Sequence, residues 1–129
     1  MNELIAASKH AMLSPNLFIR HTSGTRLRRY QQGVCEAICD SVLNRRGLSF
    51  VVMFPRQSGK NELQAQLETY LLALFCDTPV EIIKVSPTLK PQAQNAMRRL
   101  ERTLKKNLYL SNAWHKEAGT IYRVQEARI

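Results

Sequence analysis

The sequence predicts an α/β fold in which helices flank a mainly parallel sheet. Short, continuous apolar runs alternate along the chain with segments whose apolar residues recur every three or four positions. Such runs are typical of parallel strands buried on both faces, and a strand, helix, strand, helix order implies right-handed βαβ crossovers. A loop containing glycine and lysine joins the first run to the next helical segment, which is where folds of this class bind phosphate.

The composition is that of a globular domain with polyanionic partners. A chain of 129 residues with 44% hydrophobic content can build one domain with a core. The net charge of +9 favours nucleic acid, nucleotide phosphates or an anionic membrane surface. No apolar run approaches the roughly 20 residues that span a bilayer, and the N-terminus lacks a leader pattern, so we expect a cytoplasmic protein. Cys35 and Cys39 complete neither a disulfide framework nor a zinc site and are expected to be small buried residues.

Residues 1–26 are expected to form an N-terminal helix and a linker. Asn2–Leu13 has helical composition, Ser14–Asn16 then breaks the pattern, and His21–Thr25 has the composition of a loop. The amphipathic helix that follows ends near Gly47. Its apolar stripe consists of Tyr30, Val34, Ala37, Ile38 and Val42.

The second part of the chain is expected to form the α/β domain. Leu48–Phe54 (LSFVVMF) and Val80–Val85 (VEIIKV) are the predicted core strands, and Thr120–Val124 (TIYRV) is a third. The predicted helices are Asn61–Phe75 and Lys90–Lys106, each with an apolar stripe along one side. Because a sheet of this kind normally has more strands, we expect the fold to be incomplete at its C-terminal side.

The loop Phe54–Asn61 (FPRQSGKN) lies between the first predicted strand and the next helix. It fits the phosphate-loop pattern G-x-x-x-x-G-K-[ST] at Gly59 and Lys60 but not at its two ends. In this position several backbone N–H groups point toward one spot, and the helix dipole adds positive potential. Gly59 permits close backbone approach, and Lys60 can reach the β- and γ-phosphates. The alternative interpretation is a basic glycine turn that binds nothing.

Three segments resemble the motifs of one protein family. RQSGKN, at Arg56–Asn61, resembles the arginine-bearing Walker A motif of phage terminase large subunits, the ATPases that pump viral DNA into capsids. LRRYQQ, at Leu27–Gln32, resembles their adenine-recognition segment. VSPTLKPQAQNAMRRL, at Val85–Leu100, resembles the second-strand motif that these ATPases share with helicases. The resemblance covers residues 27–129.

The resemblance implies a P-loop NTPase fold with three layers, and hydrolysis of ATP coupled to translocation of double-stranded DNA. It implies that Lys60 and Arg56 act as catalytic residues on the β- and γ-phosphates, that Tyr30 stacks on adenine and that Gln31 reads its edge. The implied ATP-binding residues are Tyr30, Gln31, Pro55, Arg56, Gln57, Ser58, Gly59, Lys60 and Asn61. The implied partners in a full protein are a portal, a small terminase subunit and like subunits in a ring, within a bacterial host cell and away from membranes.

The sequence departs from the family pattern at the metal ligands. Asn61 stands where Ser or Thr usually gives a hydroxyl to Mg²⁺, so a weaker ligand is expected there. No apolar run ending in Asp-Glu follows Leu110, so the Walker B carboxylates are missing, and a nuclease domain is missing as well. The simplest account is an N-terminal fragment that does not turn over ATP by itself.

Other interpretations apply to several of these residues. Tyr30 also fits the core face of its helix, and Gln92 and Gln94 are of a type more often solvated than bound to a ligand. The rival functions are a helicase-type ATPase and a non-catalytic nucleic-acid-binding module. The nucleic-acid-binding module would use the basic face of the Lys90–Lys106 helix. In an ATPase, that face is either a solvated surface or a contact with DNA or a neighbouring subunit. The basic residues of that helix are Arg98, Arg99, Arg102, Lys105 and Lys106.

Overall fold

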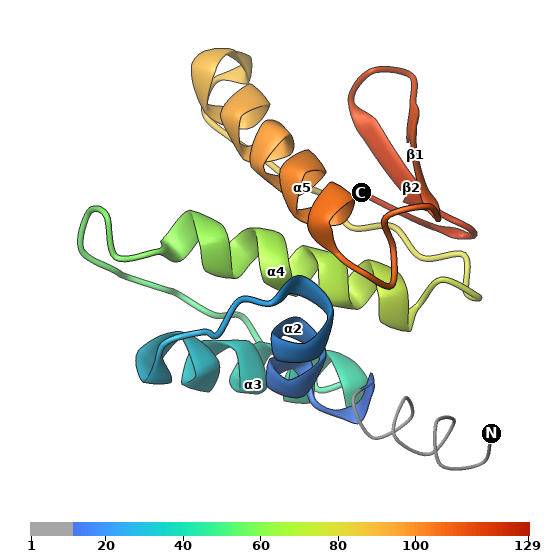
Figure 1. Cartoon of the computed structure of the whole chain (residues 1–129). Helices are drawn as coiled ribbons and strands as arrows, with labels where there is room; N and C mark the ends of the chain where they lie inside the picture. The colour runs from blue at the N-terminus through green and yellow to red at the C-terminus, as the bar shows by residue number, and fades with distance from the viewer. Residues whose placement is uncertain (1–11) are drawn as a thin grey trace, which may run out of the picture. The chain divides into compact units, whose positions relative to one another are not determined.

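The computed structural model describes residues 12–129, which divide into two compact units. The first unit ends at Leu63, and the second runs from Gln64 to Ile129. About half of the chain is helical, as Figure 1 shows. The elements in chain order are α2 (Pro15–Ser23), α3 (Arg29–Leu43), α4 (Lys60–Leu74), the short π-helical segment η1 (Leu89–Ala93), α5 (Gln94–Lys106), β1 (Trp114–Glu117), β2 (Ile121–Val124) and β3 (Ala127–Arg128). No helix in the described range is long and apolar enough to cross a membrane.

Helix α2 begins at the residues that the sequence analysis interpreted as a helix break. The hydroxyl of Ser14 caps the helix by accepting a hydrogen bond from the backbone N–H of Leu17 at 3.4 Å. Pro15 occupies the first turn, where its missing N–H is not needed. The helix continues to Ser23 and ends at Gly24, whose φ of 68° lies in the left-handed region.

The first unit packs α2 against α3. Phe18 and Ile19 of α2 are buried, as are Cys35 and Cys39 of α3, so the expectation of small buried cysteines is confirmed at these two positions. A hydrogen bond with the thiol of Cys35, together with burial, raises the pKa of Cys39 far above its ordinary range. The predicted loop at residues 21–25 is wrong for residues 21–23, which belong to α2. The predicted helix at residues 2–13 lies outside the described range, apart from its last two residues.

The residues of the first predicted strand, Leu48–Phe54, are extended but pair with no strand in the described part of the chain. Val51 is 89% exposed and Met53 is 87% exposed. The prediction of a strand buried on both faces is therefore wrong. An apolar run indicates that burying the segment would stabilise the folded protein. It does not specify which neighbouring strands would bury it.

The second predicted strand, Val80–Val85, forms only an isolated parallel bridge between Glu81 and Arg128. The backbone N–H of Ile82 donates to the carbonyl of Arg128 at 2.9 Å, and the N–H of Arg128 donates to the carbonyl of Val80 at 3.1 Å. Toward its end this segment exposes its apolar side chains. The prediction of a buried core strand is wrong here as well.

The strands that form make an antiparallel sheet in the order β1-β2-β3. Strand β1 pairs with β2 from Trp114 opposite Val124 to Glu117 opposite Ile121, and β2 pairs with β3 across a tight turn. The predicted strand Thr120–Val124 is confirmed as β2. Neither of its two antiparallel partners was predicted.

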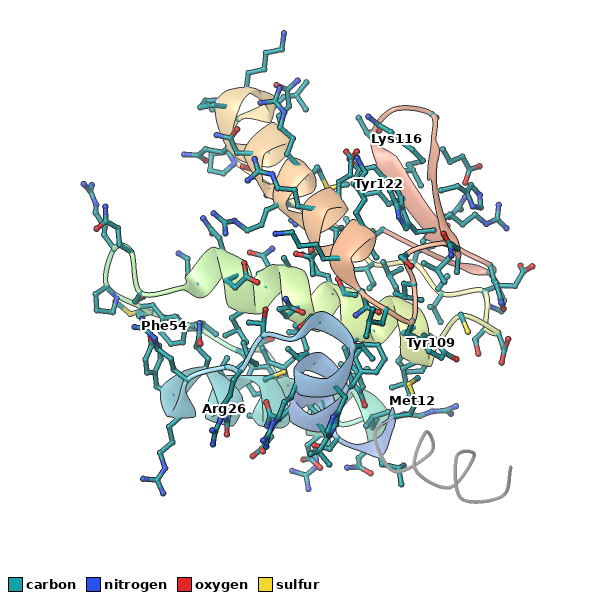
Figure 2. All side chains as sticks on the ribbon, viewed as in Figure 1. Met12, Arg26, Phe54, Tyr109, Lys116 and Tyr122 are labelled. Carbon is teal, nitrogen blue, oxygen red and sulfur yellow. The ribbon has the colours of Figure 1, made fainter. Side chains whose placement is uncertain are left out.

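Helix α5 packs its apolar side into the second unit. The predicted helix Asn61–Phe75 is confirmed as α4. The predicted helix Lys90–Lys106 is confirmed as α5 with the end of η1, except at Lys90, whose backbone is not helical. Tyr122 lies on β2, where Figure 2 labels it. Its hydroxyl donates to Oε2 of Glu101 on α5 at 3.0 Å. Burial, with the hydrogen bond and charge of Glu101, raises the pKa of Tyr122 to about 12. This contact therefore ties the sheet to α5.

These findings overturn the predicted fold class. The described residues are about half helical and contain one small antiparallel sheet, within residues 114–128, instead of the three-layer, mainly parallel sheet of a P-loop NTPase. The helical segments were predicted from local periodicity and are present. The parallel sheet was inferred from two apolar runs, and neither run forms a ladder with another strand.

Candidate functional site

The predicted phosphate loop lies in the first unit and leads directly into α4. Lys60 is the first residue of this helix, and the carbonyl of Gly59 accepts the backbone N–H of Leu63 at 3.0 Å, which closes the first turn. The backbone N–H groups of Lys60 and Asn61 therefore lie at the helix start, where the helix itself offers them no acceptor. These groups and the helix dipole produce a positive potential at this end of α4.

Two side chains from the start of α3 hold this loop. The hydroxyl of Tyr30 donates to the backbone carbonyl of Ser58, and Nε2 of Gln31 donates to the carbonyl of Gly59 at 2.9 Å. Oε1 of Gln31 accepts the backbone N–H of Arg28 at 2.8 Å, so both ends of the amide are engaged, and Gln31 is only 5% exposed. The two segments that resembled an adenine motif and a phosphate loop thus meet across 28 residues of sequence.

The close approach of Gln31 explains why glycine occupies position 59. Its φ is 85°, a conformation that L side chains rarely adopt. A Cβ atom at this position would lie 2.5 Å from Nε2 of Gln31, which is closer than real Cβ contacts. Within the loop, the hydroxyl of Ser58 donates to the carbonyl of Pro55 at 2.5 Å, and Gln57 also has a positive φ, of 59°. The loop is therefore shaped both by its own turn and by α3.

An aromatic pair borders the loop. The rings of Tyr30 and Phe54 meet edge to face, with centroids 5.3 Å apart and an interplanar angle of 86°. Tyr30 is still 43% exposed, and Nη1 of Arg28 lies 3.4 Å from its hydroxyl as a donor. The sequence analysis included Phe54 in the predicted phosphate loop without a role of its own and assigned no role to Arg28. The available signals were that Phe54 ends the apolar run before the loop and that Arg28 stands within the segment resembling the adenine motif.

The cations of the loop face solvent. Arg56, Lys60 and Asn61 are all exposed, and neither Arg56 nor Lys60 forms an ion pair with any residue in the described range. The first turn of α4 also contains one acidic residue, Glu62. The combination of two uncompensated cations and a helix start suits an anion that carries several phosphates.

The donors beside the loop fit Mg²⁺ only in part. Asn61 offers a single neutral amide oxygen, whereas protein-bound Mg²⁺ usually takes one or two carboxylates together with phosphate oxygens and water. Among residues 12–129, no group of three or more His, Cys, Asp or Glu side chains is arranged to hold a metal ion. A metal held beside the loop would therefore need ligands other than the amide oxygen of Asn61.

An open groove with a volume of about 360 Å³ lies between α3 and the end of the extended segment. Its lining contains no charged or polar side chain and consists of Gly33, Val34, Ala37, Phe50, Val51, Val52, Met53 and Phe54. Such a lining suits an apolar or flat aromatic group and not phosphate. The polar, cationic part of the candidate site is therefore the loop and not this groove.

The candidate site draws all its residues from one compact unit. The start of α3 supplies Tyr30 and Gln31, the loop supplies residues 55–59, and the first turn of α4 supplies Lys60 and Asn61. These are the positions that the sequence analysis selected, and the two groups are in contact through the bonds to Ser58 and Gly59. Comparisons of the chain with protein-family models, with curated proteins and with solved structures find no match.

Proposed function

We propose that this chain binds ATP, with the phosphates held by loop residues 55–59 and the start of α4. The observation that carries the proposal is the hydrogen bond from Gln31 to Gly59, which joins the segment resembling an adenine motif to the phosphate-type loop. The proposal requires a helix start, a glycine with positive φ and adjacent cations. It does not require the parallel sheet that the sequence analysis expected.

Each group of the loop has a distinct role in this proposal. The backbone N–H groups from Gln57 to Lys60 surround the phosphates, and the ammonium group of Lys60 acts as a flexible point charge on the β- and γ-phosphates. The guanidinium of Arg56 forms two parallel hydrogen bonds to phosphate oxygens. Tyr30 stacks on adenine with its exposed ring, while Gln31, whose amide is engaged, positions the loop.

We further propose that the chain is the ATP-binding part of a terminase-type motor that moves double-stranded DNA in the cytoplasm of a bacterial host. A portal, a small terminase subunit and like subunits in a ring would then be its partners. Phosphoryl transfer depends on carboxylates that neutralise charge and orient the attacking water. The first turn of α4 offers only Glu62, so we expect ATP binding without turnover from this chain alone.

Calorimetric titration with ATP tests the proposed site. Lys60→Ala should weaken ATP binding by about tenfold or more, since it removes one charge-assisted hydrogen bond. Lys106→Ala is the matched control, because it removes the same charge from an exposed position on α5 and should leave ATP affinity unchanged. Equal affinity of the wild type and Lys60→Ala, or no heat from a wild type whose circular dichroism shows it to be folded, would refute ATP binding at this loop.

A further inference from the structure

Helix α5 separates its charged residues sharply from its apolar ones. Leu100 and Leu104 are 0% exposed, so one side of the helix is packed within the second unit. The opposite side is solvent-exposed and basic. It consists of Arg98, Arg99, Arg102, Lys105 and Lys106, which at about 100° per residue fall within an arc of about 120°. We call these five residues the basic face of α5.

Little negative charge compensates the basic face. Glu101 is the only acidic residue of α5, and it pairs with Lys105 at 2.9 Å and with Tyr122 at 3.0 Å. The side chains of Arg98, Arg102 and Lys106 form no ion pair or hydrogen bond with any residue in the described part of the chain. Exposed like charges at this density repel one another, and a polyanion relieves that repulsion.

We propose that the basic face of α5 binds the phosphate backbone of a nucleic-acid duplex without sequence preference. Arg98 and Lys106 are separated by about 12 Å along the helix at 1.5 Å per residue. Over that length one strand of B-form DNA presents three or four phosphates, at roughly 3.4 Å each along the axis. The face thus matches a short stretch of one strand in both length and number of charges.

The surroundings of the face favour a duplex over other polyanions. Proteins that bind single strands stack bases on aromatic side chains, and the five residues of this face include no aromatic residue. The ring of Trp114 lies beside the face, 6.0 Å from Nζ of Lys105, and packs edge to face against Tyr122. An amphipathic helix that lies on a membrane inserts its apolar side into the lipid, but Leu100 and Leu104 are already fully buried in the protein. The five exposed side chains of the face are all cationic, which suits a regular phosphate backbone.

This inference does not rest on the proposed ATP site. The basic face belongs to the second unit and the phosphate loop to the first, and the two share no residue. Loss of ATP binding in Lys60→Ala should therefore leave duplex binding intact, and loss of the basic face should leave ATP binding intact. The two proposals fail separately.

Fluorescence anisotropy with a labelled duplex of random sequence, from 50 to 200 mM salt, tests the inference. If four cations contact phosphates, the slope of log K against log salt is about −3.6, so the wild type loses roughly 150-fold in affinity over that range. The triple variant Arg98→Gln/Arg102→Gln/Lys106→Gln should have a slope of about −0.9 and lose only about 3.5-fold. The single variant Arg102→Gln should change the slope by about 0.9.

A charge-matched control distinguishes binding by the basic face of α5 from attraction by the net positive charge of the protein. Arg20→Gln/Arg26→Gln/Arg46→Gln removes three exposed cations from the first unit and should leave the salt slope at the wild-type value. The inference is overturned if this control weakens duplex binding as much as the α5 variant does, or if the α5 variant binds like the wild type. It is also overturned if a poly-dT strand, or vesicles with anionic lipids, bind as tightly as the duplex and depend on the same three residues.

Discussion

Replacing Gly59 with alanine tests the geometry of the loop most directly. At a φ of 85°, an L side chain is strained by about 1–2 kcal/mol. The new Cβ would also lie 2.5 Å from Nε2 of Gln31, so the amide must move and its bond to the Gly59 carbonyl, worth about 1 kcal/mol, is lost. We therefore expect the first unit to lose about 2–3 kcal/mol of stability. ATP binding should weaken as well, because the backbone N–H groups after Gly59 turn with it.

Urea denaturation followed by circular dichroism measures the loss of stability, and hydrogen exchange at the Leu63 amide, which bonds to the Gly59 carbonyl, reports on the loop itself. Gly33→Ala is the matched control. It lies inside α3 with no atom within 4 Å of the new Cβ, so it should stabilise the helix by up to about 1 kcal/mol. If Gly59→Ala had unchanged stability, unchanged Leu63 exchange and unchanged ATP affinity, the contact between Gln31 and the loop would not exist as described.

Three further changes probe the site, the extended segment and the second unit. Tyr30→Phe keeps the ring but loses the hydrogen bond to the loop, which is worth about 1 kcal/mol, so calorimetry should show ATP binding weaker by up to about fivefold. Unchanged affinity would mean that the hydroxyl does not support the loop. Val51→Lys should change stability in urea by no more than about 0.5 kcal/mol because the side chain is 89% exposed, whereas a loss of several kcal/mol would indicate a buried strand after all. The raised pKa of Tyr122 means that the neutral phenol is favoured by folding, so its contribution is complete below about pH 10 and is lost as pH rises toward 12. Between about pH 10 and pH 12, the melting temperature of Tyr122→Phe should therefore fall less steeply with pH than that of the wild type. If the two melting temperatures fell in parallel, the raised pKa of Tyr122 would not be the cause of the loss.

The helices could be predicted because their signal is local. In α5 the spacing of Leu100 and Leu104 alone shows which side is buried, and both residues are fully buried in the structure. Helix α2 was missed because a Ser-Pro pair ends one helix as readily as it begins another. To decide between these outcomes one must know that α2, in which Phe18 and Ile19 are buried, packs against α3. That packing is a tertiary contact and not a property of the local sequence.

The strands were harder to predict than the helices, because a strand forms only where a partner strand pairs with it. Leu48–Phe54 is the most strand-like segment of the chain by composition, yet it pairs with no strand in the described range. Trp114–Glu117 has little apolar character, yet it forms β1 because a turn containing Gly119, with a φ of 77°, brings it back against β2. Hydrophobicity indicates how much burial would stabilise a segment, whereas the turn beside the segment determines whether a partner strand lies next to it.

The candidate site was predicted less completely than the helices and better than the strands. Its geometry gives Gln31 a role that the motif did not suggest. The motif predicted that Gly59 is needed so that a phosphate can approach the backbone, but the structure adds a second reason, the close approach of the Gln31 amide. In a trans peptide the C=O and N–H groups point in opposite directions. Because Gln31 and the Leu63 N–H hold the carbonyl of Gly59, the N–H of Lys60 in the same peptide is turned away from them. In the proposed site, the residue that the motif assigned to adenine therefore fixes the direction of one of the N–H groups that would meet phosphate, that of Lys60.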